Sequence, residues 1–232
     1  MNERKVNNIR NLKVALLPLL FLLYGCSKHH QDYFPLGNHA WWEYTITRTV
    51  DSKQLTQKYV VATLPPREIN GITVFPRKSA SGSIELYTKS NNGIVRLRSL
   101  EDTGMQVLRY PLQVGTKWKG SSRISFLEIP GQNRAEIWAT TGPVQLEYRI
   151  EAINETVEVP AGIFLHCVRI EGRGHLNTKR ALKLFAGVRT IRVEHTDWYA
   201  PGTGLVKSVR QETASPNTIN GNYTMELESF RL

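Results

Sequence analysis

Polar and apolar positions alternate along most of the chain beyond residue 33. From Trp41 to Val50 the alternation is rich in aromatic and β-branched residues, the pattern of a strand with one buried face. Turn chemistry separates such runs, as in Pro65-Pro66 and Asn92-Gly93. The same pattern predicts further strands over residues 57–64, 71–76, 83–90, 93–100, 117–126, 135–141, 145–154, 162–171, 190–199, 204–210 and 222–230.

Helical periodicity is weak throughout this part of the chain. The best helix candidate is 176–186, where Leu182, Phe185 and Ala186 are apolar, but Gly187 cuts it short. Strands separated by turns at this density predict an all-β fold with little helix. We expect a curled antiparallel sheet, as a partly open barrel or a sandwich, forming a single domain over residues 33–232.

The first 25 residues have the three parts of a secretory signal. Four basic residues come first, an apolar run of ten residues follows over 14–23, and the small Gly25 ends the segment. A membrane-spanning helix needs about 20 apolar residues, so this run is too short to be a permanent anchor. We interpret residues 1–25 as a signal peptide that is removed.

The end of this segment, Leu23-Tyr24-Gly25-Cys26, resembles the bacterial lipobox. The resemblance implies cleavage between Gly25 and Cys26 and acylation of the Cys26 thiol, with palmitate-type chains holding the protein at a membrane. Residues 26–32 then form a tether. Because Ser27 and not an aspartate follows the cysteine, we expect the outer membrane, with the domain facing the periplasm.

Composition limits the chemistry of the remaining chain. The first 25 residues hold four of the 30 basic and one of the 20 acidic residues, which leaves 26 and 19 and a net charge of +7. Once Cys26 carries lipid, Cys167 has no partner for an intrachain disulfide. Its apolar surroundings in the sequence predict a small buried side chain, against the alternative of a nucleophile.

No catalytic motif was found, so we expect a protein that is not an enzyme and needs no cofactor. Glu194, His195 and Asp197 lie close in sequence, but strand alternation places only His195 and Asp197 on one face. No third ligand can be named, so we predict an exposed polar strand face and no metal site. Trp198 and Tyr199 could stack on a ligand, but aromatic residues capping a hairpin are the favoured interpretation.

One segment, 173–192, is strongly basic and has no acidic residue. It predicts a patch for an anionic partner, either an anionic lipid, an acidic glycan or an envelope protein, with a solvated loop as the alternative. Nucleic acid is not expected at this location, because aromatic residues are sparse in the segment. The patch consists of Arg173, Lys179, Arg180, Lys183, Arg189 and Arg192.

Three motifs carry a family resemblance: Tyr33-Phe-Pro-Leu36, Val159-Pro-Ala-Gly-Ile-Phe164 before Cys167, and Trp198-Tyr-Ala-Pro-Gly-Thr-Gly-Leu-Val-Lys207. Together they resemble a family of uncharacterised bacterial secreted proteins and lipoproteins, the TapB-like proteins. The resemblance implies an extended antiparallel sheet and no particular activity. The motifs also have structural explanations, because the proline and glycine residues suit tight turns between strands.

These observations favour a membrane-anchored, non-enzymatic binding or assembly module of the bacterial envelope. Two alternatives remain. The first is a carrier of lipid or another apolar ligand in a concave sheet, and the second is a hydrolase of envelope polymers. An apolar cavity would favour the carrier, and an accessible His-Asp arrangement would favour the hydrolase.

Overall fold

The computed structural model describes residues 32–50, 52–97, 104–124, 143–177, 190–215 and 219–232. The chain separates into two units, Met1–His30 and Gln31–Leu232, and every described residue belongs to the second. Among the described residues there is no helix, so the predicted all-β fold is confirmed. Accordingly, none of them belongs to a helix that could cross a membrane.

The strands are β1 (Trp41–Val50), β2 (Lys53–Thr63), β3 (Arg67–Ile69), β4 (Ile72–Ser79), β5 (Ile84–Ser90), β6 (Gly93–Leu97), β7 (Met105–Arg109), β8 (Lys117–Ser122), β9 (Val144–Val159), β10 (Gly162–Asn177), β11 (Thr190–Ala200), β12 (Gly204–Ser215) and β13 (Ile219–Arg231).

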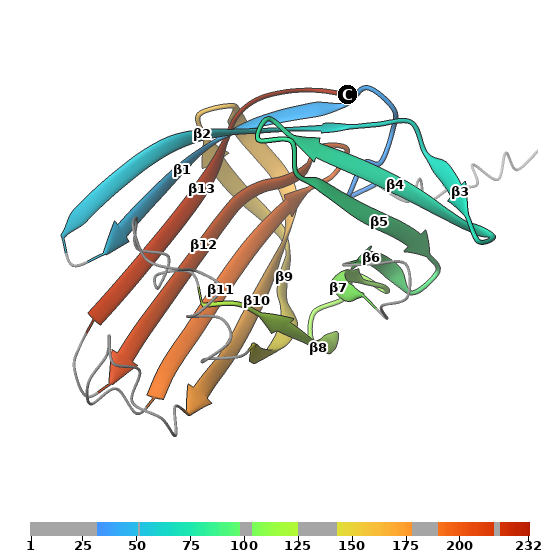
Figure 1. The fold of residues 1–232 in the computed structure, drawn as a ribbon. Coiled ribbons are helices and arrows are strands. Elements are labelled where there is room, and N and C mark those ends of the chain that lie inside the picture. Colours follow the sequence, from blue (N-terminus) through green and yellow to red (C-terminus); the bar gives the residue numbers. More distant parts are fainter. Residues whose placement is uncertain (1–31, 51, 98–103, 125–142, 178–189, 216–218) are drawn as a thin grey trace, which may run out of the picture. The chain divides into compact units, whose positions relative to one another are not determined.

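These strands form one antiparallel sheet in the order β7-β6-β5-β4-β2-β1-β13-β12-β11-β10-β9-β8, with β3 paired to β4. The first and last strands meet inside it, because β1 pairs with β13 over its whole length. Figure 1 shows the sheet curling so that its edge strands, β7 and β8, approach each other. Trp118 of β8 donates a hydrogen bond to the carbonyl oxygen of Gln106 in β7 at 3.2 Å, but no ladder joins these strands. The sheet is therefore nearly closed into a barrel with one unsealed seam.

Most predicted strands agree with the structure, and β1 has the predicted limits. The hairpin through Asn92-Gly93 is also confirmed, since Ser90 pairs with Gly93, which has φ of +125°. β3 and β7 were not predicted. The helix candidate is wrong at its start, because Leu176 and Asn177 end β10. The rest of that candidate, and the strand predicted over 135–141, lie outside the described residues.

Two clusters of buried side chains fill the inner side of the sheet. The larger one contains Leu146 and Ile150 of β9 with Ile191 and Val193 of β11, and the other surrounds Trp42 of β1. Between them lies the buried guanidinium group of Arg77. It is 4.1 Å from the ring centre of Phe34 and 4.4 Å from that of Trp42, and it donates a hydrogen bond to the carbonyl oxygen of Pro35 at 2.6 Å. Aromatic faces and one carbonyl thus replace the water that a buried cation loses.

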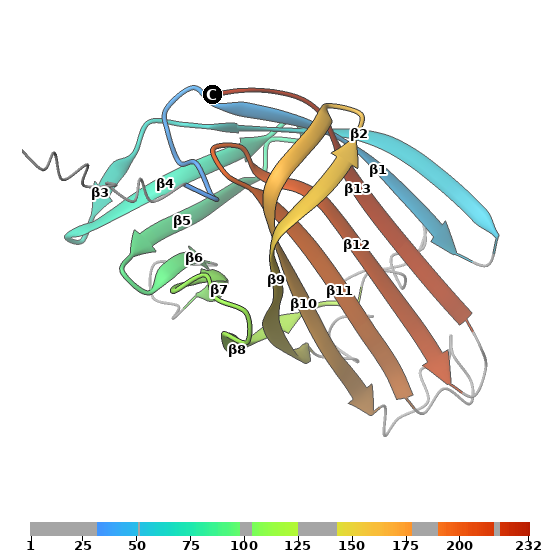
Figure 2. The same ribbon diagram turned by 180° about the vertical axis from the view of Figure 1, so that it is seen from behind.

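The tip of the β9–β10 hairpin leaves the regular sheet. Residues 153–167, which we call the arm, begin at irregularities where Asn154 and His166 have positive φ. Such bulges bend a hairpin and increase its twist. In both views the arm lies at the same end of the sheet as the chain's C-terminus (Figures 1 and 2).

One face of the arm is packed against the sheet. Val157, Val159 and Cys167 are buried in the cluster around Trp42, together with Val206 of β12 and Leu227 of β13. The amide of Ala161, in the turn, donates a hydrogen bond to the carbonyl oxygen of Leu227 at 2.9 Å. The arm is therefore fixed on the body by both apolar packing and a main-chain bond.

Candidate functional site

At the other end of the same hairpin, β10 and β11 form a groove on the outer face of the sheet. The two strands are paired, with His175 opposite Arg192 and Arg173 opposite Glu194. Alternation turns Ile191 and Val193 into the core and leaves Arg192 and Glu194 outside. The groove has a volume of about 450 Å³ and is lined by Arg173, Gly174, His175, Thr190, Arg192 and Glu194.

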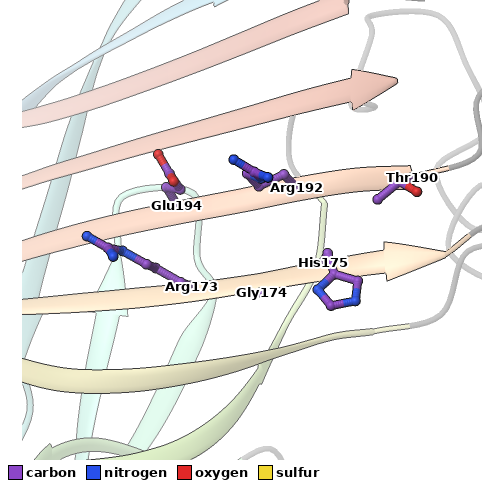
Figure 3. Close-up of a pocket in the computed structure, with 6 residues that line it drawn as sticks. All are labelled: Arg173, Gly174, His175, Thr190, Arg192 and Glu194. Carbon is purple, nitrogen blue, oxygen red and sulfur yellow. The ribbon is translucent and has the colours of Figure 1, made fainter. Parts of the chain in front are cut away.

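The groove is positively charged and rich in hydrogen-bond donors. Figure 3 shows Arg173 and His175 rising from β10 beside Arg192, Thr190 and Glu194 of β11. Two guanidinium groups against one carboxylate leave an excess of positive charge. Arginine donates in a planar fork that fits carboxylate or phosphate oxygens. This arrangement can bind an anion, and the Thr190 hydroxyl donates to Asn177 Oδ1 at 3.3 Å.

Charges along β10 are paired near the arm and less paired toward the groove. Arg169 bonds Glu155 at 2.9 Å and also contacts Glu171, and Glu171 accepts a further bond from Arg173 at 2.7 Å. Arg192 has no ion pair with any described residue. Arg173 itself is 70% exposed, so its interaction with Glu171 is weak and leaves it available.

Of the predicted basic patch, the structure describes the first and the last residue in the sequence. Arg173 and Arg192, which are 19 positions apart in the sequence, lie on adjacent strands and line the same groove. The other four members, Lys179, Arg180, Lys183 and Arg189, lie outside the described residues. So do Gly25 and Cys26 of the predicted cleavage and lipidation site.

The prediction of an exposed polar face at His195 and Asp197 is wrong. Their side chains are only 21% and 16% exposed, because they share the inward face of β11 with Ile191 and Val193. His195 Nε2 lies 3.0 Å from Asp197 Oδ1 and 3.1 Å from the hydroxyl oxygen of Ser208. Glu194 faces the opposite side, as alternation predicts, and lines the outer groove.

This His-Asp-Ser group has the composition of a catalytic triad but not its geometry. Asp197 and Ser208 both approach the same ring nitrogen of His195, whereas a triad requires one partner on each nitrogen. Ser208 is also only 3% exposed, so a substrate could not reach its hydroxyl. The arrangement is that of a structural polar network.

Burial and neighbouring charges set the ionisation of this network. Burial opposes the ionisation of Asp197, but His195, Ser208 and Arg210 outweigh it and lower the pKa of the carboxyl below its usual value. Nearby, Arg210 donates to Glu212 at 2.6 Å, and both side chains are buried. Burial also raises the pKa of Tyr148 to about 12, so its hydroxyl stays neutral.

A missing side chain makes room for this network. Tyr148 of β9 and His195 of β11 flank Gly172 of β10 in the ladder. A Cβ atom on Gly172 would lie 2.5 Å from the Tyr148 ring, so any other residue would displace that ring. The Tyr148 ring therefore reaches His195, with 6.2 Å between ring centres, and stacks on Trp118 on its other side.

Two further predictions are confirmed. Cys167 is fully buried, and burial together with Glu155 raises the pKa of its thiol to about 11, which keeps it protonated and unreactive. Trp198 donates to Glu155 at 2.9 Å at the base of the arm, and Tyr199 is buried in the core. Both aromatic residues are therefore packed against groups of the protein, which agrees with the favoured structural interpretation.

Some interior polar residues were not singled out from the sequence. Ser208, Arg210 and Glu212 share one face of β12 with the buried Val206 and Ala214. They alternate with exposed Gln211 and Thr213, but in the sequence both faces of this strand carry polar residues, so alternation could not tell which face lies inside. Arg77 gave no signal either, since its aromatic partners Phe34, Trp42 and Tyr87 come from three separate segments.

Comparison with known proteins gives only distant structural likenesses. No protein-family model and no curated protein matches the chain. A Bacteroides fragilis protein inferred to be exported, with a YmcC-like fold, is 16% identical, with a TM-score of 0.44 over 86% of this chain and 98% of its own. A protein from Parabacteroides distasonis inferred to be a lipoprotein is 13% identical, with a TM-score of 0.39 over 87% and 99%. A DUF1329 family protein from Desulfovibrio piger is 10% identical, with a TM-score of 0.22 over 84% and 85%.

Proposed function

We propose that this protein is a lipid-anchored, non-enzymatic binding module of the bacterial envelope that captures an anionic partner in the β10–β11 groove. The observation that carries the proposal is the convergence of Arg173 and Arg192 on one groove from adjacent strands. The anchor is the lipid on Cys26, at the periplasmic face of the outer membrane. Membership of the TapB-like group, based on the three motifs, is part of the same proposal.

The partner we propose is an acidic polysaccharide. His166, at the base of the arm, and His175, in the groove, are nine residues apart on β10, roughly 30 Å at the rise of a strand. The tether from Cys26 to Asp32 spans at most about 20 Å. Tyr33, where the domain begins, contacts the arm end of β10. The residue from which the tether leaves the domain and the groove thus lie toward opposite ends of β10, which favours a partner other than the headgroups of the anchoring membrane.

The interior favours neither alternative function. A carrier of apolar molecules needs an open apolar cavity, whereas the two clusters of buried side chains fill the inner side of the sheet among the described residues. A hydrolase needs an accessible nucleophile, whereas Ser208 is buried. Binding of an anion at the outer groove requires neither an apolar cavity nor an accessible nucleophile.

The binding function is tested with the purified full-length chain and polygalacturonate, a carboxylate polymer. Arg173→Glu with Arg192→Glu should weaken binding at least tenfold, because each charge-assisted hydrogen bond contributes about 1.5–3 kcal/mol. The matched control reverses Lys53 and Arg67, two exposed basic residues on β2 and β3. Equal losses in both double variants would show that net charge, and not the groove, causes the binding.

A further inference from the structure

Three aliphatic side chains of the arm are exposed. Ile163 is 66% exposed, Leu165 is 55% exposed and Ile153 is 46% exposed. All three come from the arm, and Ile163 and Leu165 are two positions apart on β10. Both side chains are exposed, whereas Phe164 between them packs against the cluster around Trp42, so Ile163 and Leu165 lie on the side of the arm away from that cluster. The arm thus presents a small apolar surface to its surroundings.

This surface is held in place by the rest of the arm. Val157 and Val159 are buried on the other side, and the Ala161–Leu227 bond fixes the turn. Ile163 and Leu165 could therefore be buried against the domain only if the arm left its position on the sheet. A fixed, exposed apolar surface is typical of a site that meets another apolar phase or a partner.

The start of the described chain lies against the same arm. The hydroxyl of Tyr33 donates to the carbonyl oxygen of His166 at 3.0 Å, one residue from Leu165. Asp32 is fixed as well, because its carbonyl oxygen accepts from the amide of Gly202 at 2.8 Å and its carboxylate pairs with Lys89 at 3.0 Å. The tether to Cys26 therefore starts beside the apolar face of the arm.

We infer that the side chains of Ile163 and Leu165 on the arm insert into the surface of the membrane that holds the Cys26 lipid. This inference rests on the proposed lipid anchor. Cys26 is six positions before Asp32, so the acylated thiol can lie at most about 20 Å from Asp32, and the arm can reach the bilayer surface. Glu158, which pairs with Ile163 across the hairpin, is exposed and limits insertion to the interfacial layer.

Fluorescence quenching by lipid tests the inference on the full-length acylated protein. Leu165→Cys is labelled with bimane, since Cys26 carries lipid and Cys167 is buried. The protein is placed in phosphatidylethanolamine–phosphatidylglycerol vesicles that contain nitroxide-labelled phosphatidylcholine. Leu55→Cys is the control, because Leu55 is 53% exposed and pairs with Arg48 near the far end of β1 from Trp41.

We expect quenching at position 165 at least threefold greater than at position 55. Equal quenching at both positions overturns the inference. A blue shift at 165 that grows with protein concentration, without lipid quenching, would identify a second copy as the occupant and also overturn it. The mass of the same sample separates the two proposals: an unmodified Cys26 refutes the anchor, whereas acylated protein with an unquenched probe refutes only the arm.

Discussion

The two ends of the β9–β10 hairpin differ in what they expose. At the arm, the outward positions of β10 are Ile163 and Leu165, and at the groove they are Arg173 and His175. Between them, Arg169 and Glu171 neutralise each other. One strand thus changes from apolar, through paired charges, to basic over twelve residues, roughly 40 Å of strand. Such a gradient suits a molecule that meets a membrane at one end and an anion at the other.

The interior of the sheet, unlike the two ends of the hairpin, holds a buried ion pair between Arg210 and Glu212. Removing one of these two charges should have the largest effect on stability. Glu212→Gln leaves Arg210 buried without its carboxylate, although Ser122 and the Arg123 carbonyl still accept from it. We expect a loss of about 3 kcal/mol in the free energy of unfolding, measured by urea denaturation.

The control for this variant is Glu147→Gln. Its partner Lys117 lies 3.2 Å away, and both side chains are more than half exposed. That change should cost less than about 1 kcal/mol. Similar losses in the two variants would contradict a buried ion pair in the interior.

Arm variants should separate its docked face from its free face. Val159→Ala removes buried methyl groups and should cost about 2 kcal/mol of unfolding free energy. Ile163→Ala, four residues away, should cost less than about 0.5 kcal/mol, because its side chain is exposed. If Ile163→Ala proved as costly as Val159→Ala, the arm's outer face would be packed and unavailable to a membrane.

Acid titration tests the polar network that lies between the two ends. The folded pKa of Asp197 is lowered, so its contribution to stability is present above the unfolded value of about 3.9 and is lost as the pH falls below it. Asp197→Asn should therefore be less stable than the parent at pH 7, and the difference should shrink as the pH falls through about 4. A difference that is constant from pH 7 to pH 3 would rule out this ionic contribution.

The smallest effect on binding is expected for Glu171, which lies on β10 between Arg169 and the groove residue Arg173. Glu171 holds Arg173 at 2.7 Å, so Glu171→Gln should free this guanidinium group for the groove. Polygalacturonate affinity should rise about twofold to threefold, with stability lowered by less than about 1 kcal/mol because Glu171 also contacts Arg169. Isothermal titration calorimetry measures the affinity, and an unchanged value would mean that Arg173 does not contact the polymer.

The fold was largely predictable because alternation survives wherever a strand is regular. The limits of β1 were predicted without error. In contrast, β9 was predicted to end at Asn154 but continues to Val159. Asn154 and His166 have positive φ, and the bulges there shift which residues face inward, so the pattern breaks at the base of the arm. Short β3, with three residues, leaves too little pattern to detect.

The candidate site was only half predictable for a similar reason. The basic composition of the 173–192 segment was evident, but the pairing that joins Arg173 to Arg192 depends on the register of two strands. His195 and Asp197 were expected outside because they are polar. Their parity with Ile191 and Val193 would have placed them inside, and it should have outweighed polarity.

The opposed ends of the hairpin are tested most directly by spin labels on the acylated protein in vesicles. One label replaces Leu165 on the arm, and the other replaces Thr213, an exposed residue that pairs with Arg192 beside the groove. Collision rates are measured with oxygen, which concentrates in the bilayer, and with a water-soluble nickel chelate. We predict that position 165 collides preferentially with oxygen and position 213 with nickel. The same preference at both positions, or its reversal, would contradict a molecule with a membrane end and a binding end.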